Sequence, residues 1–128
     1  MVFSVLHTSA EDWSQWRGPD RNNISQETEW TDEWTDGQPK EVWRSEVQLG
    51  FGSMVVSNGR LFTMGHNGEK TVTLFCLDSK TGKRIWKHSW QSDLGDKYFE
   101  GGAVTTPIVN ERHLYVLGRW GKVFCMKA

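Results

Sequence analysis

An internal repeat is the feature of this sequence that most restricts its fold. Residues 60–68 match residues 113–121 position by position in residue class, at an offset of 53. Residues 75–77, Phe-Cys-Leu, match residues 124–126, Phe-Cys-Met, at an offset of 49, so the first copy carries four extra residues. Two copies of a unit of roughly 50 residues lie in the period range of β-propeller blades. The chain is therefore expected to build one supersecondary unit twice.

Inside each copy, alternating apolar residues predict short antiparallel strands. Asn58-Gly59 is typical of a tight hairpin turn, and glycine-containing polar stretches at 65–68 and 78–83 divide the remaining apolar segments. The first copy then has four strands and the second has three, which predicts an all-β fold. The expected strands are 41–47, 54–56, 60–64, 70–77 and 84–89, then 105–109, 113–117 and 122–126.

A nine-residue stretch, 78–86, joins a turn to a tryptophan-bearing strand. The Asp78 carboxylate is expected to accept hydrogen bonds from backbone N–H groups two or three residues on, and Thr81 to bond locally. Gly82 is suited to the positive φ that such a bulged turn needs, and Lys83 completes the turn. Trp86 is then free to pack its ring between neighbouring sheets.

Segment 41–47 resembles the strand that carries Trp86. Glu41-Val42-Trp43-Arg44 corresponds to Arg84-Ile85-Trp86-Lys87, so we expect 41–47 to be an outer strand as well. No inner strands precede it in the chain. Its expected place is therefore in the last blade of a ring, where it would close the sheet edges.

Three motifs give this chain a resemblance to a known family. They are Asp-x-x-Thr-Gly-Lys-x-x-Trp at 78–86, Gly-Gly-x-x-x-Thr-Pro-x-Val at 101–109, and Trp-Ser-Gln-Trp-Arg-Gly-Pro at 13–19. Together they resemble the pyrroloquinoline-quinone (PQQ)-like β-propeller repeat proteins, which include the outer-membrane assembly lipoprotein BamB and the quinoprotein alcohol dehydrogenases. The resemblance implies antiparallel four-stranded blades, here incomplete: about one and three-quarter blades plus an N-terminal closing strand.

Charge and composition divide the chain into three parts. Residues 1–10 are compatible with a signal-peptide remnant and equally with an ordinary terminus, so both interpretations stay open. Residues 11–40 form an acidic leader with four tryptophans, and residues 41–128 begin the repeat domain. Residues 1–40 have a net charge of -5 and residues 41–128 a net charge of +4, so the two parts are expected either to pack together or to remain two solvated surfaces. The overall charge of -1 argues against nucleic-acid binding, and no stretch is long enough to span a membrane.

Strand alternation brings three connections to one face of the blades, and this face is the candidate site for a partner. They are the loops 65–69, 91–102 and 118–121, of which 91–102 is the longest, and long loops often carry function. A polar surface loop is the alternative interpretation. The candidate residues are His66, Asn67, Asp93, Lys97, Tyr98, Glu100, Arg119 and Trp120.

The sequence lacks the common catalytic and metal-binding motifs. It contains no metal-ligand spacing, Gly-x-Ser-x-Gly elbow, phosphate-binding loop or adjacent cysteine pair. Cys76 and Cys125 are expected to be small buried hydrophobic residues. We expect Trp13, Trp16, Trp30 and Trp34 to pack rather than to stack on sugars.

These observations favour an extracytoplasmic binding or assembly scaffold, periplasmic, secreted or on the cell surface, over an enzyme. The scaffold would bind a protein partner or a small ligand on one propeller face. No cofactor is evident in the sequence itself. The resemblance keeps open the alternative of a PQQ-dependent alcohol dehydrogenase, with PQQ and calcium bound in the full-length protein.

Overall fold

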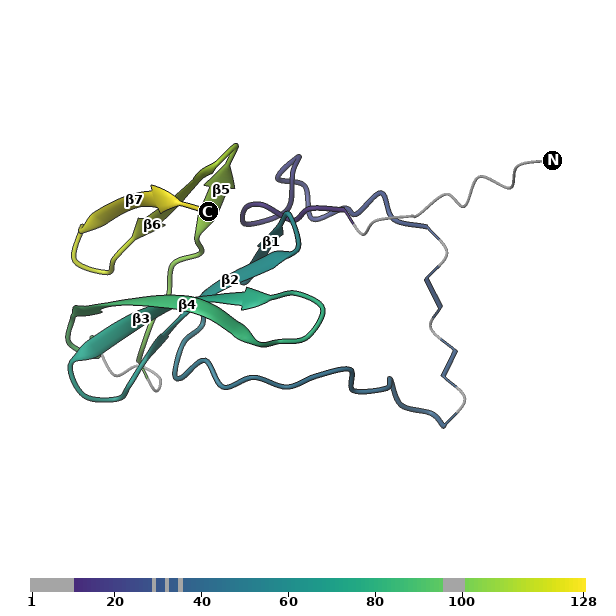
Figure 1. The fold of residues 1–128 in the computed structure, drawn as a ribbon, viewed down its shortest axis with the longest axis horizontal. Helices are drawn as coiled ribbons and strands as arrows, with labels where there is room; N and C mark the ends of the chain where they lie inside the picture. The colour runs from purple at the N-terminus through teal and green to yellow at the C-terminus, as the bar shows by residue number, and fades with distance from the viewer. Residues whose placement is uncertain (1–10, 29, 32, 35, 96–100) are drawn as a thin grey trace.

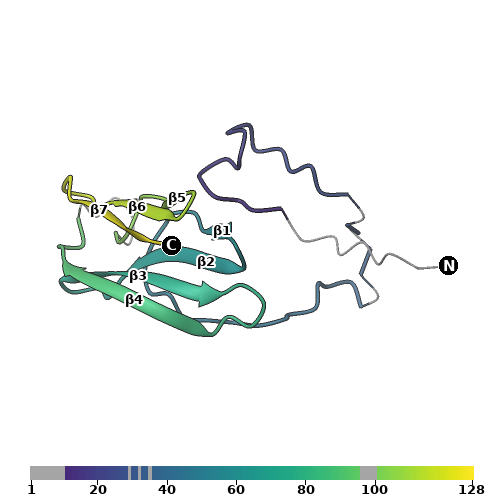
Figure 2. The same cartoon turned by 45° about the horizontal axis from the view of Figure 1, so that its top comes forward.

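Two antiparallel β-sheets, stacked face to face, make up the body of the protein (Figures 1 and 2). The computed structural model describes residues 11–95, except 29, 32 and 35, and residues 101–128. The first sheet has the order β1-β2-β3-β4 and the second the order β5-β6-β7. The elements are β1 (Val55–Ser57), β2 (Arg60–His66), β3 (Thr71–Asp78), β4 (Arg84–Gln91), β5 (Ile108–Asn110), β6 (His113–Leu117) and β7 (Val123–Lys127).

The all-β prediction is confirmed, and so is the division into a four-stranded and a three-stranded sheet. The described residues contain no helix, and thus none that could cross a membrane. In the first hairpin, Asn58 and Gly59 both adopt positive φ angles, 49° and 72°. This is the backbone geometry for which an Asn-Gly pair is suited.

Residue alternation along the strands of the first sheet places two apolar clusters on its opposite faces. Val55, Phe62 and Leu74 point toward the second sheet and belong to the larger cluster, to which Leu114 and Val116 contribute from β6. Successive side chains of a strand point to opposite faces, so the residues between them form a separate cluster on the far side. Its buried members are Leu61, Phe75 and Leu77.

The turn between β3 and β4 has the predicted structure. Asp78 Oδ1 accepts hydrogen bonds from the backbone N–H groups of Lys80, at 3.1 Å, and Thr81, at 2.8 Å, and from the Thr81 hydroxyl at 2.8 Å. These bonds, the Thr81 hydroxyl first, lower the pKa of Asp78 below its ordinary value of 3.8, because they stabilise the ionised carboxylate. Gly82 has a φ of +66°, as expected.

Segment 41–47 does not form the predicted outer strand. None of its residues belongs to a strand, yet Trp43, Ser45 and Val47 are half-buried while their neighbours are exposed. Trp43 and Val47 pack against the cluster on the far face of the first sheet. Alternate side chains of this extended segment are thus half-buried, as in a strand. The segment nevertheless contacts the first sheet through side chains and belongs to no hydrogen-bonded strand pair.

Trp43 packs its ring on Gly82 in the turn. A Cβ atom at Gly82 would lie 2.4 Å from Cε3 of the ring, so only glycine leaves space for this contact. The indole Nε1 donates a hydrogen bond of 3.1 Å to the carbonyl oxygen of Ser79. Trp86 is also half-buried and faces the opposite side, where its ring centroid lies 5.9 Å from that of Phe62. Trp86 therefore packs between the two sheets, as predicted.

Part of the acidic leader docks where the two sheets meet. Val56 donates its backbone N–H to the Trp13 carbonyl oxygen at 3.0 Å, and Val109 donates to the Ser14 carbonyl oxygen at 2.8 Å. The Asp12 carboxylate accepts hydrogen bonds from the Ser57 hydroxyl and the Asn58 N–H. The expected packing of leader and repeats therefore occurs at residues 12–14, and hydrogen bonds at strand edges carry it. The chain from 20 to 42 is exposed at its described positions and loops away from the sheets (Figure 2).

Two expectations about individual side chains are wrong in part. Trp13 is half-buried against Gly18, but Trp16, Trp30 and Trp34 are exposed, so only the first leader tryptophan packs. Cys76 is buried and Cys125 is exposed, and both thiols are free. Cys125 differs because it lies on the outward face of the second sheet, which no described segment covers. Segment 1–10, for which two interpretations were open, lies outside the described residues.

Candidate functional site

His66 is a structural residue. Its side chain is fully buried, and both ring nitrogens form hydrogen bonds. Nε2 lies 3.0 Å from the carbonyl oxygen of Ser92, which can only accept, so Nε2 carries the proton. Nδ1 accepts a 3.0 Å bond from the Gly68 N–H. The imidazole therefore joins the 65–69 turn to the start of the 91–102 loop and is inaccessible to a partner.

Asn67 organises the same turn. Its side-chain oxygen accepts hydrogen bonds from the backbone N–H groups of Glu69, Lys70 and Thr71 at 3.0 to 3.2 Å. A side chain that accepts three backbone bonds fixes the local chain direction. Of the predicted partner face, His66 and Asn67 thus form the support rather than the contact surface.

Asp93 and Trp120 form the exposed part of the face. The indole Nε1 of Trp120 donates a 3.0 Å hydrogen bond to Asp93 Oδ1, joining loops that are 27 residues apart in the sequence. The Trp120 side chain remains 63% exposed, so the bond fixes the ring without burying it. An indole that is held in place and still open to solvent is suited to contact another molecule, because tryptophan buries a large area at low entropic cost.

Arg119 lies beside this pair. Its guanidinium packs on Gly95, where a Cβ atom would lie 1.8 Å from Nη1, so the contact depends on glycine at position 95. Among the described residues, Arg119 Nε is a buried nitrogen without a hydrogen-bond acceptor. A buried, unpaired donor costs about 1–3 kcal/mol.

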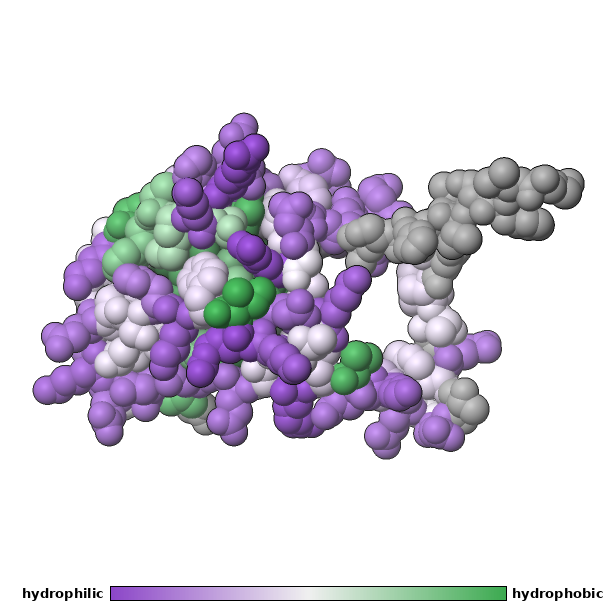
Figure 3. Space-filling view, viewed as in Figure 1, coloured by the Kyte–Doolittle hydropathy of each residue, from purple (hydrophilic) through white to green (hydrophobic). Residues whose placement is uncertain are grey.

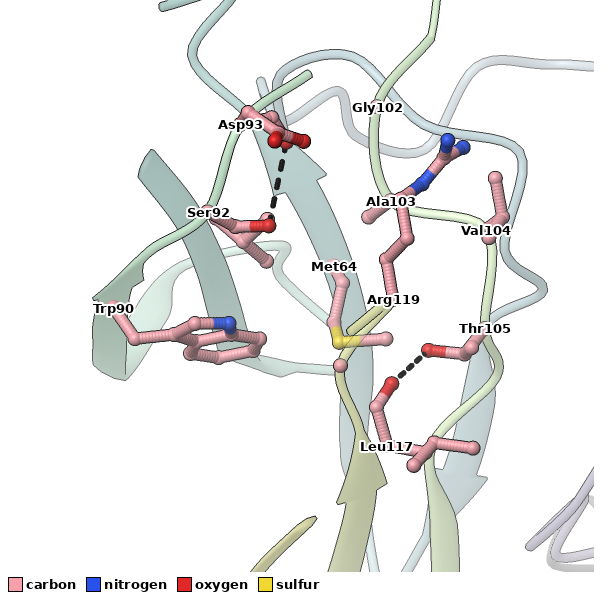
Figure 4. Close-up of a pocket in the computed structure, with 12 residues that line it drawn as sticks. Met64, Trp90, Ser92, Asp93, Gly102, Ala103, Val104, Thr105, Leu117 and Arg119 are labelled. Carbon is pink, nitrogen blue, oxygen red and sulfur yellow. Dashed lines mark hydrogen bonds between the residues drawn. The ribbon is translucent and has the colours of Figure 1, made fainter. Parts of the chain in front are cut away.

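The pocket beneath these residues is too small for an organic ligand. Figure 4 shows Arg119 on one side of it, near Gly102 and Ala103, with Trp90 and Ser92 opposite. Its open volume is about 10 Å³, which is room for roughly one water molecule. Any partner would therefore bind on the rim, at Asp93, Arg119 and Trp120, rather than inside.

Strand alternation predicted that loops 65–69, 91–102 and 118–121 meet, and the bonds from His66 to Ser92 and from Trp120 to Asp93 confirm this for the start of the 91–102 loop. Lys97, Tyr98 and Glu100, which the sequence also assigned to this face, lie outside the described residues. Sequence reasoning missed Ser92, whose carbonyl oxygen accepts a hydrogen bond from His66 Nε2, and Gly95, on which the Arg119 guanidinium packs. Every residue has a backbone carbonyl, so the sequence could not indicate that the one of Ser92 accepts this hydrogen bond. Gly95 could have been noticed as a glycine inside a polar loop.

The described residues do not fit the calcium and quinone site that the family resemblance implies. No group of three His, Cys, Asp or Glu side chains in this part of the chain could hold a metal ion. The two free cysteines are 49 positions apart, and one of them is buried while the other is exposed. No step of quinone chemistry can therefore be derived from the residues described.

In comparisons with family models, with curated proteins and with solved structures, nothing matches this chain. The resemblance to PQQ-like propeller proteins rests on the sequence motifs alone.

Proposed function

We propose that this chain belongs to a PQQ-like β-propeller repeat protein that acts outside the cytoplasm as a binding or assembly scaffold. Two stacked antiparallel sheets, one of four strands and one of three, support the proposal, as do the hydrogen bonds of the 78–83 turn. In this proposal each sheet is a blade, and the loop face carries the partner site.

The observation that carries the scaffold function is the pairing of the exposed Trp120 with Asp93, beside the side chain of Arg119. An exposed aromatic ring next to an arginine is the composition typical of protein-binding hot spots. The partner is a protein segment that covers the indole and presents a carbonyl or carboxylate oxygen to the guanidinium.

A photo-crosslinking amino acid at position 120 tests this proposal. In extract from the extracytoplasmic fraction of the source cells, it is expected to give a discrete adduct that excess unmodified chain competes away. The same amino acid at position 42, where Val42 is 80% exposed, is the matched control and should give none. As a competitor, excess Asp93→Ala chain should remove the adduct less well than the unmodified chain, because its Trp120 indole loses its acceptor. Equal labelling from positions 42 and 120 would contradict the proposal.

The enzyme alternative has its own test. Adding PQQ and calcium to the full-length protein should give no dye-linked oxidation of alcohols if the protein is a scaffold. Saturable oxidation under these conditions would overturn the scaffold proposal in favour of a quinoprotein dehydrogenase.

A further inference from the structure

His66 is a buried side chain that connects two loops of the proposed partner face. Its Nε2 donates to the Ser92 carbonyl oxygen and its Nδ1 accepts from the Gly68 N–H, both at 3.0 Å. A backbone bond runs beside the ring, from the Ser92 N–H to the Lys70 carbonyl oxygen at 3.0 Å. We call His66 with its bonds to Gly68 and Ser92 the His66 joint, because it holds the 65–69 turn against the start of the 91–102 loop.

The bonds of the His66 joint fit only a neutral imidazole. A neutral imidazole has one N–H donor and one acceptor nitrogen, whereas an imidazolium has two donors and no acceptor. After protonation, Nδ1 would carry a hydrogen that faces the N–H of Gly68, so a hydrogen bond would become a contact between two donors. Histidine is the side chain that ordinarily changes charge between about pH 5 and pH 8. Acid therefore removes the bond between His66 and the turn.

The chain around His66 leaves a charged ring little room to adapt. The backbone N–H and C=O of His66 both bond to Leu49, at 2.7 and 3.1 Å, so its backbone is fixed. On the other side, Asn67 Oδ1 accepts three backbone N–H bonds and fixes the turn that carries Gly68. Burial of a charge without a partner is costly. Either the ring moves outward or the turn opens, and both changes loosen the His66 joint.

Among the described residues, no carboxylate is bonded to the imidazole, because backbone groups occupy both of its nitrogens. The charged residues on the segments around the ring are Glu46, Glu69, Lys70, Asp93 and Arg119. The three acidic side chains are exposed, and Asp93 already accepts the Trp120 indole N–H. Hydrophilic residues cover this loop end of the body, at the left of the view in Figure 3. An imidazolium is therefore better accommodated in solvent than inside the His66 joint.

We propose that the His66 joint is an acid-sensitive switch that regulates the partner face. At neutral pH the ring holds the start of the 91–102 loop in place, so Asp93, next to Ser92, fixes the Trp120 indole. When His66 takes up a proton, the joint opens, Asp93 moves with its loop and the indole loses its fixed acceptor. The face then binds its partner more weakly in acid. This inference rests on the proposed function, because it assigns a regulation to the same face.

NMR of the whole chain without a partner tests the switch, in a titration from about pH 8 to about pH 5. Long-range nitrogen–proton spectra of the imidazole report the protonation of His66. Amide hydrogen exchange, corrected for the intrinsic rate at each pH, reports the bond to Gly68. The indole N–H resonance of Trp120, assigned with a Trp120→Phe variant, reports the bond to Asp93.

As His66 takes up its proton, the Gly68 amide should lose about tenfold in protection, which is the effect of one lost hydrogen bond. The Trp120 indole resonance should shift with the same midpoint. His66→Gln keeps a donor and an acceptor that do not titrate, so its Trp120 resonance should stay constant. His113→Gln is the matched control, because His113 is exposed at the start of β6, and should leave the titration unchanged. If circular dichroism shows His66→Gln unfolded, the midpoints in the unmodified chain decide.

Three results would overturn the proposal. One is protonation of His66 without loss of Gly68 protection or without a shift of the Trp120 indole. Another is a Trp120 shift that persists in folded His66→Gln, because another group would then cause it. The third is a His66 ring that stays neutral throughout the titration. None of these measurements uses a partner, so they leave the crosslinking test of the proposed function unaffected. Coincident midpoints without an adduct at position 120 would reject the partner and keep the switch.

Discussion

Replacing Gly82 by alanine tests the contact that fixes segment 41–47 to the first sheet. The substitution has two costs. Gly82 has a φ of +66°, and an L-residue in the left-handed region costs roughly 1–2 kcal/mol. The new Cβ would also lie 2.4 Å from the Trp43 ring, so the ring must move.

The second cost follows from what Trp43 loses when it moves. Its hydrogen bond to Ser79 contributes about 0.5–1.5 kcal/mol, and the half-buried ring loses part of its packing on the Leu61, Phe75 and Leu77 cluster. Adding the two costs, Gly82→Ala should destabilise the protein by about 2–4 kcal/mol. Equilibrium unfolding in urea, followed by far-ultraviolet circular dichroism, measures this loss.

Two controls separate strain from the displaced ring. Gly59 has a similar φ of +72° with nothing within 4 Å of an added Cβ, so Gly59→Ala should cost only about 1–2 kcal/mol. In a Trp43→Ala background, the cost of Gly82→Ala should fall to that same value. If Gly82→Ala costs no more than Gly59→Ala, or costs the same with and without Trp43, the ring does not depend on Gly82 and the reasoning is refuted.

Three further predictions concern other parts of the fold. Hydrogen bonds hold the pKa of Asp78 below 3.8, so its carboxylate stabilises the protein above that pH, and this contribution is lost as the pH falls through the lower folded-state pKa. Asp78→Asn should therefore make stability fall less steeply with acid, as measured by thermal melting from pH 5 to pH 2. An unchanged dependence on acid would contradict this prediction. A thiol reagent should modify Cys125 in the native protein and reach Cys76 only on unfolding, because Cys76 is buried and burial raises its pKa; mass spectrometry of labelled peptides checks this, and equal labelling would disprove it. Asp12→Ala should cost about 1–2 kcal/mol in urea unfolding, since the Ser57 hydroxyl and the Asn58 N–H lose their acceptor, while Asp20→Ala in the exposed leader should cost almost nothing.

Local patterns in the sequence determined the strands and turns of this protein. Alternation predicted all seven strands to within a few residues, because side chains of a strand must divide between a buried and an exposed face. Turn chemistry predicted the bonds of Asp78 and Thr81, since these contacts join residues two or three positions apart. Equivalent loops were also placed correctly on one face, because strand direction alternates.

Contacts between distant segments were decided by tertiary structure alone. Segment 41–47 has the alternation of a strand, but side-chain packing of Trp43 on Gly82 holds it, and no local pattern distinguishes that from a hydrogen-bonded ladder. Cys76 and Cys125 occupy equivalent positions in the repeat, yet only the first is covered, because burial depends on which neighbour faces a sheet. Burial by neighbouring segments likewise explains why His66 is buried and hydrogen-bonded to Ser92, while Trp120, on a neighbouring loop, is exposed to solvent.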